Sequence, residues 1–167
     1  MKLGVLSAML GIGGFLFTAC SSANQAGAIA PAQAAQPSGI IRSQSDLQRY
    51  LSATPDSAPP LGLLSSGARQ RFLSNLTFNA AGVTGFRYDD LQNELTASQA
   101  YSVLALFGFQ QDIAIIPHLR VVTSEDKRRI SEFNPVDGDG NGDYPNYACA
   151  SRATCAPHTS TICTHNC

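Results

Sequence analysis

The sequence predicts a small α+β domain with about four helices, one β-hairpin and short additional strands. Apolar residues recur at helical spacing in four segments, and a run of β-forming residues interrupted by turn residues lies between the second and third of them. The order helix, helix, hairpin, helix, short strands, helix is typical of α+β domains. These elements fall within residues 40–133, a length that can bury a modest core.

The first two predicted helices lie on either side of a proline-rich connection. Ser45 is the expected N-cap of the first, which places Leu47, Tyr50 and Leu51 on one face. The second is expected over residues 66–75.

A β-hairpin is predicted directly after the second helix. Residues 76–78 and 83–88 are β-forming, and the four residues between them begin with Asn79 and end with Gly82. Because Asn and Gly tolerate a positive φ, this segment suits a hairpin loop.

The clearest helix signature covers residues 97–107. Thr96 and Gln99 match a capping box, in which each side chain accepts a hydrogen bond from a free backbone N–H. Gly108 follows as an expected left-handed stop. The apolar positions inside this segment indicate core packing rather than a cofactor site.

The end of the domain is predicted to contain short strands and one charged helix. Residues 113–116 suggest a buried strand, and residues 119–122 suggest another. Ser124 is the expected cap of the last helix, in which Glu125 and Arg129 are spaced to form an ion pair.

The N-terminus carries features of an export signal. Residues 3–19 contain no charge and follow Lys2, and the segment ends in Thr18-Ala19-Cys20. Two small residues before a cysteine, after an apolar stretch, resemble the signal peptide of bacterial lipoproteins. Phe17 departs from the Leu that is usual three positions before that cysteine.

The resemblance implies cleavage after residues 1–19 and lipid attachment to Cys20, so we expect a membrane to be one partner. Residues 20–39 are charge-free and rich in Ala, Ser, Gln and Pro, a composition that predicts a flexible tether. In lipoproteins, Ser at the position of Ser21 implies an outer-membrane location.

The charge of the chain disfavours a nucleic-acid partner. Without residues 1–19 the chain has 10 basic and 12 acidic side chains, a net charge of −2, and no basic cluster stands out.

The segment 134–148 suggests either a linker or a weak calcium loop. Asp137, Asp139, Asn141 and Asp143 follow the first half of a calcium-loop pattern, with Gly142 at the sharp turn. The position of the bidentate Glu is Ala148, so an EF-hand is excluded. Between a Gly-rich linker and weak calcium binding, the pattern favours the linker.

The cysteine-rich tail, residues 149–167, carries an even set of four cysteines: Cys149, Cys155, Cys163 and Cys167. In an oxidising compartment they predict two disulfides of undetermined connectivity. Zinc binding is disfavoured because no C-x-x-C pair is present. The interleaved Ser and Thr also resemble the core of a lanthipeptide precursor, a reading that the lipoprotein signal opposes.

The domain offers no convincing catalytic set. His118 is its only histidine, and Asp112 is the nearest acidic residue before it. The adjacent carboxylates Asp89 and Asp90 are expected to begin a turn. We therefore expect a non-enzymatic envelope lipoprotein that presents its stapled tail to an unidentified envelope protein, with a hydrolase based on His118 as the alternative.

Overall fold

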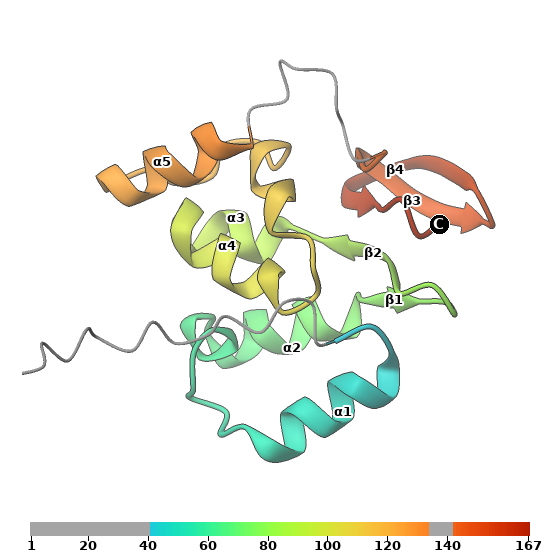
Figure 1. Ribbon diagram of the computed structural model, residues 1–167, viewed down its shortest axis with the longest axis horizontal. Coiled ribbons are helices and arrows are strands. Elements are labelled where there is room, and N and C mark those ends of the chain that lie inside the picture. Colours follow the sequence, from blue (N-terminus) through green and yellow to red (C-terminus); the bar gives the residue numbers. More distant parts are fainter. Residues whose placement is uncertain (1–40, 134–141) are drawn as a thin grey trace, which may run out of the picture. The chain divides into compact units, whose positions relative to one another are not determined.

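The computed structural model describes residues 41–133 and 142–167 of the chain, and this part contains five α-helices and a four-stranded antiparallel sheet (Figure 1). The predicted α+β class is therefore confirmed. The helices are α1 (Gln44–Ala53), α2 (Ser66–Ser74), α3 (Asp89–Glu94), α4 (Ala97–Ala105) and α5 (Ser124–Glu132), with two 3₁₀-helices, η1 (Leu61–Leu63) and η2 (Gln110–Ala114). The strands are β1 (Thr77–Phe78), β2 (Val83–Arg87), β3 (Tyr144–Ser151) and β4 (Thr154–Cys163).

The helix α4 and its signals agree with the sequence. Thr96 and Gln99 form the expected capping box, and the Gln99 side chain accepts a hydrogen bond from the Thr96 N–H at 2.9 Å. Gly108 has a φ of 84°, the left-handed conformation that ends the helical path.

The N-caps of two helices lie one or two residues before the predicted caps. Ser43, rather than Ser45, caps α1, and its side chain accepts from the Asp46 N–H. Thr123, rather than Ser124, caps α5 in a capping box with Asp126. Each predicted cap lies within two residues of another hydroxyl, and the pattern of residue types does not choose between such neighbours.

The strand predicted over residues 113–116 is wrong. The chain there forms the 3₁₀-helix η2, which is held by N–H groups that bond to carbonyls three residues earlier, as Ile115 does to Asp112 at 3.0 Å. Residues 119–122 contribute one isolated bridge, between Arg120 and Thr96, instead of a strand. Short apolar runs do not distinguish a strand from a buried helical turn.

The sheet joins segments that are distant in sequence. Its strand order is β1-β2-β4-β3, so the cysteine-rich β4 pairs with β2 of the predicted hairpin. The predicted hairpin is observed as β1 and β2, but the two strands that complete the sheet had no counterpart in the sequence prediction.

The core packs against one face of this sheet. Phe72 of α2 makes edge-on contacts with Phe86 of β2 and Phe107, with ring centroids 6.3 and 5.9 Å apart. Ile162 of β4 is fully buried in the same cluster. The C-terminal segment therefore belongs to the hydrophobic core and is more than an appended tail.

Candidate functional site

The hairpin formed by β3 and β4 folds back on itself. Cys155 and Cys163 lie eight residues apart in β4, yet their Cα atoms are only 6.0 Å apart. An extended strand of that length would separate them by about 26 Å. The strand β4 must therefore turn sharply between the two cysteines.

The bend in β4 lies within residues 158–161. These four residues stand opposite a single residue of β3, Asn146. Asn146 and Ser160 have φ values of 64° and 56°. The Asn146 Oδ1 accepts hydrogen bonds from the Tyr88 hydroxyl at 2.8 Å and the Ser160 N–H at 3.2 Å. Asn populates the left-handed region more readily than most residues, so it suits this corner.

Two disulfides hold the folded-back hairpin, as the sequence predicted. Cys149 bonds to Cys167, and Cys155 bonds to Cys163. The Sγ atoms of Cys149, Cys163 and Cys167 all lie within 4.8 Å of one another. The two bridges therefore form one sulfur cluster, in which every described cysteine is oxidised.

The junction between β2 and β4 attaches the hairpin to the helical part. Gly85 is the register partner of Cys163, and a Cβ at Gly85 would lie 2.9 Å from the Ile162 carbonyl oxygen. The buried Thr164 hydroxyl donates to the Val83 carbonyl at 2.6 Å. The absent side chain at Gly85 therefore permits the close approach of the two strands.

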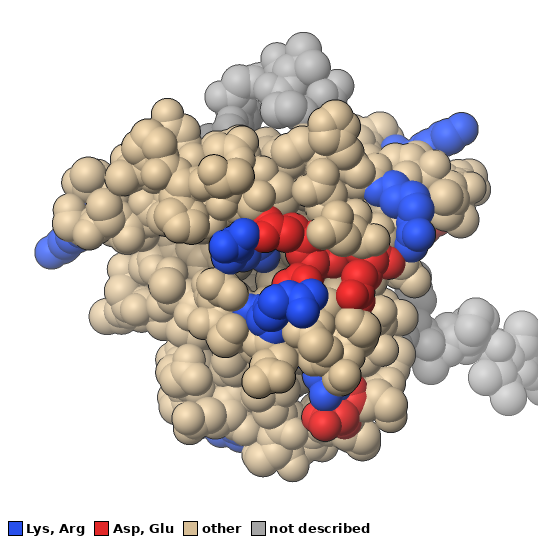
Figure 2. All heavy atoms as spheres, turned by 180° about the vertical axis from the view of Figure 1, so that it is seen from behind, with Lys and Arg blue, Asp and Glu red and all other residues tan. Residues whose placement is uncertain are grey.

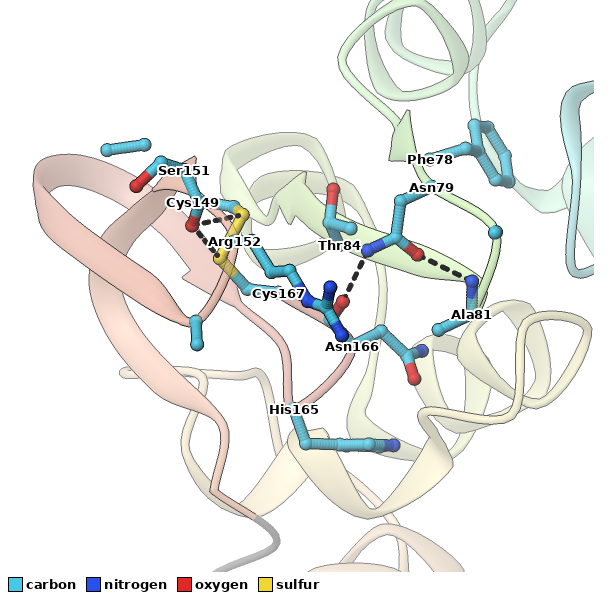
Figure 3. Close-up of a pocket in the computed structure, with 13 residues that line it drawn as sticks. Phe78, Asn79, Ala81, Thr84, Cys149, Ser151, Arg152, His165, Asn166 and Cys167 are labelled. Atoms are coloured by element: carbon cyan, nitrogen blue, oxygen red, sulfur yellow. Dashed lines mark hydrogen bonds between the residues drawn. A yellow bond between two sulfur atoms is a disulfide. The ribbon is translucent and has the colours of Figure 1, made fainter.

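An open cleft of about 810 Å³ lies between the β1–β2 loop and the disulfide-bearing end of the hairpin (Figure 3). The Asn79 amide donates to the Asn166 carbonyl at 2.6 Å and so connects the two sides. Figure 3 shows Arg152 pointing into the cleft beside the Cys149–Cys167 bridge. Because the cleft is wide and open, it resembles a contact surface more than an enclosed substrate cavity.

Next to this cleft, two buried carboxyl groups meet. Asp112, in η2, is 2% exposed, and the Asp143 side chain is also 2% exposed. The Oδ2 atom of each has no hydrogen-bond partner among the described residues. Burial, reinforced by the charge of Asp143 and a hydrogen bond to it, raises the pKa of Asp112 well above its usual range.

His165 contacts this pair from the cleft side. Its Nδ1 lies 3.0 Å from the Asp143 Oδ1, and its ring packs on Phe109 at a centroid distance of 5.5 Å. A carboxylate that orients a histidine is one part of a general-base arrangement. Within residues 41–133 and 142–167, however, no hydroxyl or thiol is hydrogen-bonded to His165, so this pair has no bound nucleophile.

The outer strand β3 presents two exposed tyrosines. Tyr144 is 54% exposed and Tyr147 is 38% exposed. Their rings meet edge to face with centroids 6.2 Å apart. The hairpin therefore carries an aromatic patch, defined as Tyr144 and Tyr147.

The face shown in Figure 2 carries acidic and basic side chains side by side. Acidic and basic side chains form ion pairs at several places in the described chain. Examples are Arg71 with Asp90 at 2.5 Å and Arg129 with Glu125 at 2.8 Å. The second of these pairs is the one that the sequence predicted for the last helix. Local pairing of this kind limits the positive potential that would attract a polyanion.

Several predicted site residues lie outside the described part of the chain. These are Cys20, Asp137, Asp139 and Asn141. Asp143 is described, and the structure brings it together with Asp112 and His165. Cys149, Cys155, Cys163 and Cys167 are also described, and the structure brings them together in the sulfur cluster.

The candidate catalytic groups of the sequence do not converge. His118 is exposed, and no hydrogen bond of its side chain is found within the two described ranges. Asp112 contacts Asp143 instead of His118. Asp89 and Asp90 begin α3 and pair with different arginines, Arg87 and Arg71.

Sequence reasoning missed the cluster of Asp112, Asp143 and His165. Its members lie 31 and 22 residues apart, in a 3₁₀-helix and at the two ends of the hairpin. The calcium-loop pattern pointed to Asp143, but no local pattern pointed to the other two.

Comparison with known proteins yields no match, whether with family models, curated proteins or solved structures. Among the described helices, none is both long and apolar enough to span a membrane. A functional argument for this chain therefore depends on its own geometry.

Proposed function

We propose that this protein is a lipid-anchored binding protein of the cell envelope that presents its disulfide-held hairpin to another envelope protein. The observation that carries the proposal is the aromatic patch on a strand that two disulfides hold in place. The chain then acts as an adaptor rather than as an enzyme.

The chemistry of the patch supports this proposal. Tyrosine is enriched at the energetic centres of protein interfaces, because it offers a large rigid surface and a polar end. Cross-links that fix the hairpin beforehand reduce the conformational entropy that binding would otherwise cost. An exposed aromatic pair on a rigid support is therefore suited to recognition.

The anchor is inferred from the sequence. Thr18-Ala19-Cys20 and the charge-free residues 20–39 support lipid attachment followed by a tether. The proposed location, from Ser21, is the outer membrane.

The anchor is tested by metabolic labelling of cells with palmitate. Wild-type protein is expected to take up label and Cys20→Ser to take up none, because Cys20 is the expected site of lipid attachment. An unlabelled wild-type protein would contradict the anchor and leave the binding role to be judged separately.

The binding role is tested by site-specific photo-cross-linking in intact cells. A photoreactive phenylalanine analogue replaces Tyr147 in one variant and Val122, which is 65% exposed and lies before α5, in the control. We expect a discrete adduct with one envelope protein from position 147 alone. Loss of the position-147 adduct when Tyr144→Ala is added to the same photoreactive variant would assign the adduct to the aromatic patch, whereas equal adducts from both positions would refute the proposal.

A further inference from the structure

The buried carboxyl groups of Asp112 and Asp143 lie together without a described group that would compensate two negative charges. Each carboxyl group keeps an Oδ2 atom without a hydrogen-bond partner, although both side chains are 2% exposed. Two carboxylates in contact cannot both be ionised in such a place unless a positive charge lies between them. Within residues 41–133 and 142–167, the ion pair that involves these carboxylates joins Asp143 to His165.

His165 does not supply this charge to the unpartnered atoms. Its backbone N–H and its Nδ1 both contact the Asp143 Oδ1. The Oδ2 atoms of Asp112 and Asp143 have no hydrogen-bond partner among the described residues. The histidine therefore fixes the orientation of Asp143 and keeps its second oxygen available. Two chemical species could compensate the charge of these two carboxyl groups: a proton that they share, or a bound cation.

The backbone beside Asp143 favours a cation. Gly142 has a φ of 70°, the conformation that the glycine at position six of a calcium loop requires. Asp143 stands at position seven of the same pattern, where the backbone carbonyl is the ligand, so this residue can offer a carbonyl as well as its carboxylate. The position-twelve residue, Ala148, lies in β3 and has no carboxylate. In the structure, the carboxylate that meets Asp143 is Asp112, from a separate element.

We propose that the Oδ2 atoms of Asp112 and Asp143 are two ligands of a site for a hard divalent cation, with calcium as the best-fitting ion. Carboxylate oxygens are the ligands that calcium prefers, and waters or backbone carbonyls complete its shell of six to eight oxygens. The cation replaces the shared proton and neutralises both carboxylates. This inference does not depend on the proposed adaptor role.

The site joins two parts of the fold. Asp112 lies in η2, which packs beside α4, and Asp143 directly precedes β3 of the disulfide-held hairpin. A bound cation would thus connect the hairpin to the helical part, in addition to the β2–β4 pairing. With two protein carboxylates, we expect a dissociation constant on the order of 10⁻⁴ to 10⁻³ M, the range of extracellular calcium modules.

The test is calorimetric titration of calcium into the detergent-solubilised mature protein at neutral pH. Wild type is expected to bind one calcium ion in that range, and Asp112→Asn to bind at least about tenfold more weakly. Asp56→Asn is the matched control, because Asp56 is an exposed aspartate paired with Arg69 in another part of the chain. Its affinity should equal that of wild type.

Terbium luminescence gives a second, independent measurement. Tyr144 is adjacent to Asp143, so excitation of tyrosine should sensitise a terbium ion bound at the pair, and calcium should displace it. The absence of wild-type binding at millimolar calcium would overturn the proposal and assign the pair to a shared proton. An unchanged affinity in a folded Asp112→Asn protein would also overturn it, because the ion would then bind elsewhere.

Discussion

Asn146 combines two roles at the corner of the hairpin. Its backbone adopts a left-handed conformation, and its side-chain oxygen accepts hydrogen bonds from Tyr88 and Ser160. The first role suits Asn or Gly, whereas the second requires the amide oxygen. The sequence alone gave no reason to single out this residue, because the partners that make it important are 58 and 14 residues away.

Substitutions at Asn146 should separate these roles. Asn146→Gly keeps the backbone freedom and loses the two hydrogen bonds, so we expect a loss of about 1 kcal/mol in the free energy of unfolding. Asn146→Ala loses both and adds backbone strain, for a total of about 2–3 kcal/mol. Urea denaturation measures the difference, and equal stabilities of the two variants would show that the left-handed backbone costs Ala nothing here.

Asp126 is a fully buried carboxylate that organises the start of two helices. It accepts hydrogen bonds from the N–H and hydroxyl groups of Ser98 and of Thr123. Burial alone would raise the pKa of Asp126, but these hydrogen bonds outweigh it and hold the pKa well below its usual range. The predicted helix that follows Ser124 includes position 126, but no pattern in the sequence indicated the contact of Asp126 with Ser98 of α4.

This lowered pKa sets the sign of a pH effect. Because the folded protein holds the Asp126 proton less tightly than the unfolded chain, the carboxylate stabilises the fold above the unfolded pKa of about 3.9, and this stabilisation falls as the pH is lowered. Asp126→Asn should cost about 2 kcal/mol at neutral pH and make unfolding less dependent on pH under acid conditions. Denaturation at several pH values tests both effects, with the exposed Asp56→Asn as a control that should behave like wild type.

Four of the five described α-helices and the first hairpin were predictable because their signals are local, whereas α3 forms where only a turn beginning at Asp89 and Asp90 was expected. The capping box at Thr96, the glycine stop at Gly108 and the turn residues between β1 and β2 act within a few residues of one another. The strands β3 and β4 escaped prediction for the opposite reason. The strand β4 pairs with the distant β2, as Ile162 does with Phe86, and β3 pairs only with β4. The bend in β4 also removes the regular alternation by which a strand is recognised.

The junction between β2 and β4 should be sensitive to any side chain at position 85. In Gly85→Ala the new Cβ would meet the Ile162 carbonyl at 2.9 Å, and backbone cannot yield as a flexible side chain does. We expect a loss of about 1–3 kcal/mol and weaker pairing of the hairpin with β2.

Gly67→Ala is the matched control for this substitution. Gly67 lies in α2, where a Cβ would be 3.4 Å from the Nη1 atom of the long Arg71 side chain and would meet no described backbone atom outside its own helix at that distance. Alanine favours a helix over glycine, so this variant should be stabilised by up to about 1 kcal/mol. If both variants have the same stability as wild type in urea denaturation, the close approach at Gly85 is not a constraint.

The disulfides stabilise the β3–β4 hairpin, whereas the hydrophobic core stabilises the helical part of the protein. Each bridge restrains the unfolded chain by about 3 kcal/mol in the entropic description. Reduction should therefore loosen β3 and β4, while the core around Leu104 and Phe107, which contains no described disulfide, stays folded. Because Ile162 is part of that core, the inner end of β4 should be the last part of the hairpin to loosen.

Hydrogen exchange on reduced and alkylated protein measures this order. Faster exchange is expected in β3 and in the outer part of β4, with little change in α4. Uniformly faster exchange across the helices would contradict the independence of the core.

The bend at Asn146 also has a consequence for self-association. An exposed edge strand with free N–H and C=O groups readily pairs with a second copy and begins aggregation. In β3, Pro145 has no N–H to offer, and the neighbouring bend prevents a long straight edge. A protein anchored by lipid, as we propose for this one, is crowded with its own copies in two dimensions. The kinked edge would keep those copies separate while leaving the tyrosine side chains of the same strand accessible.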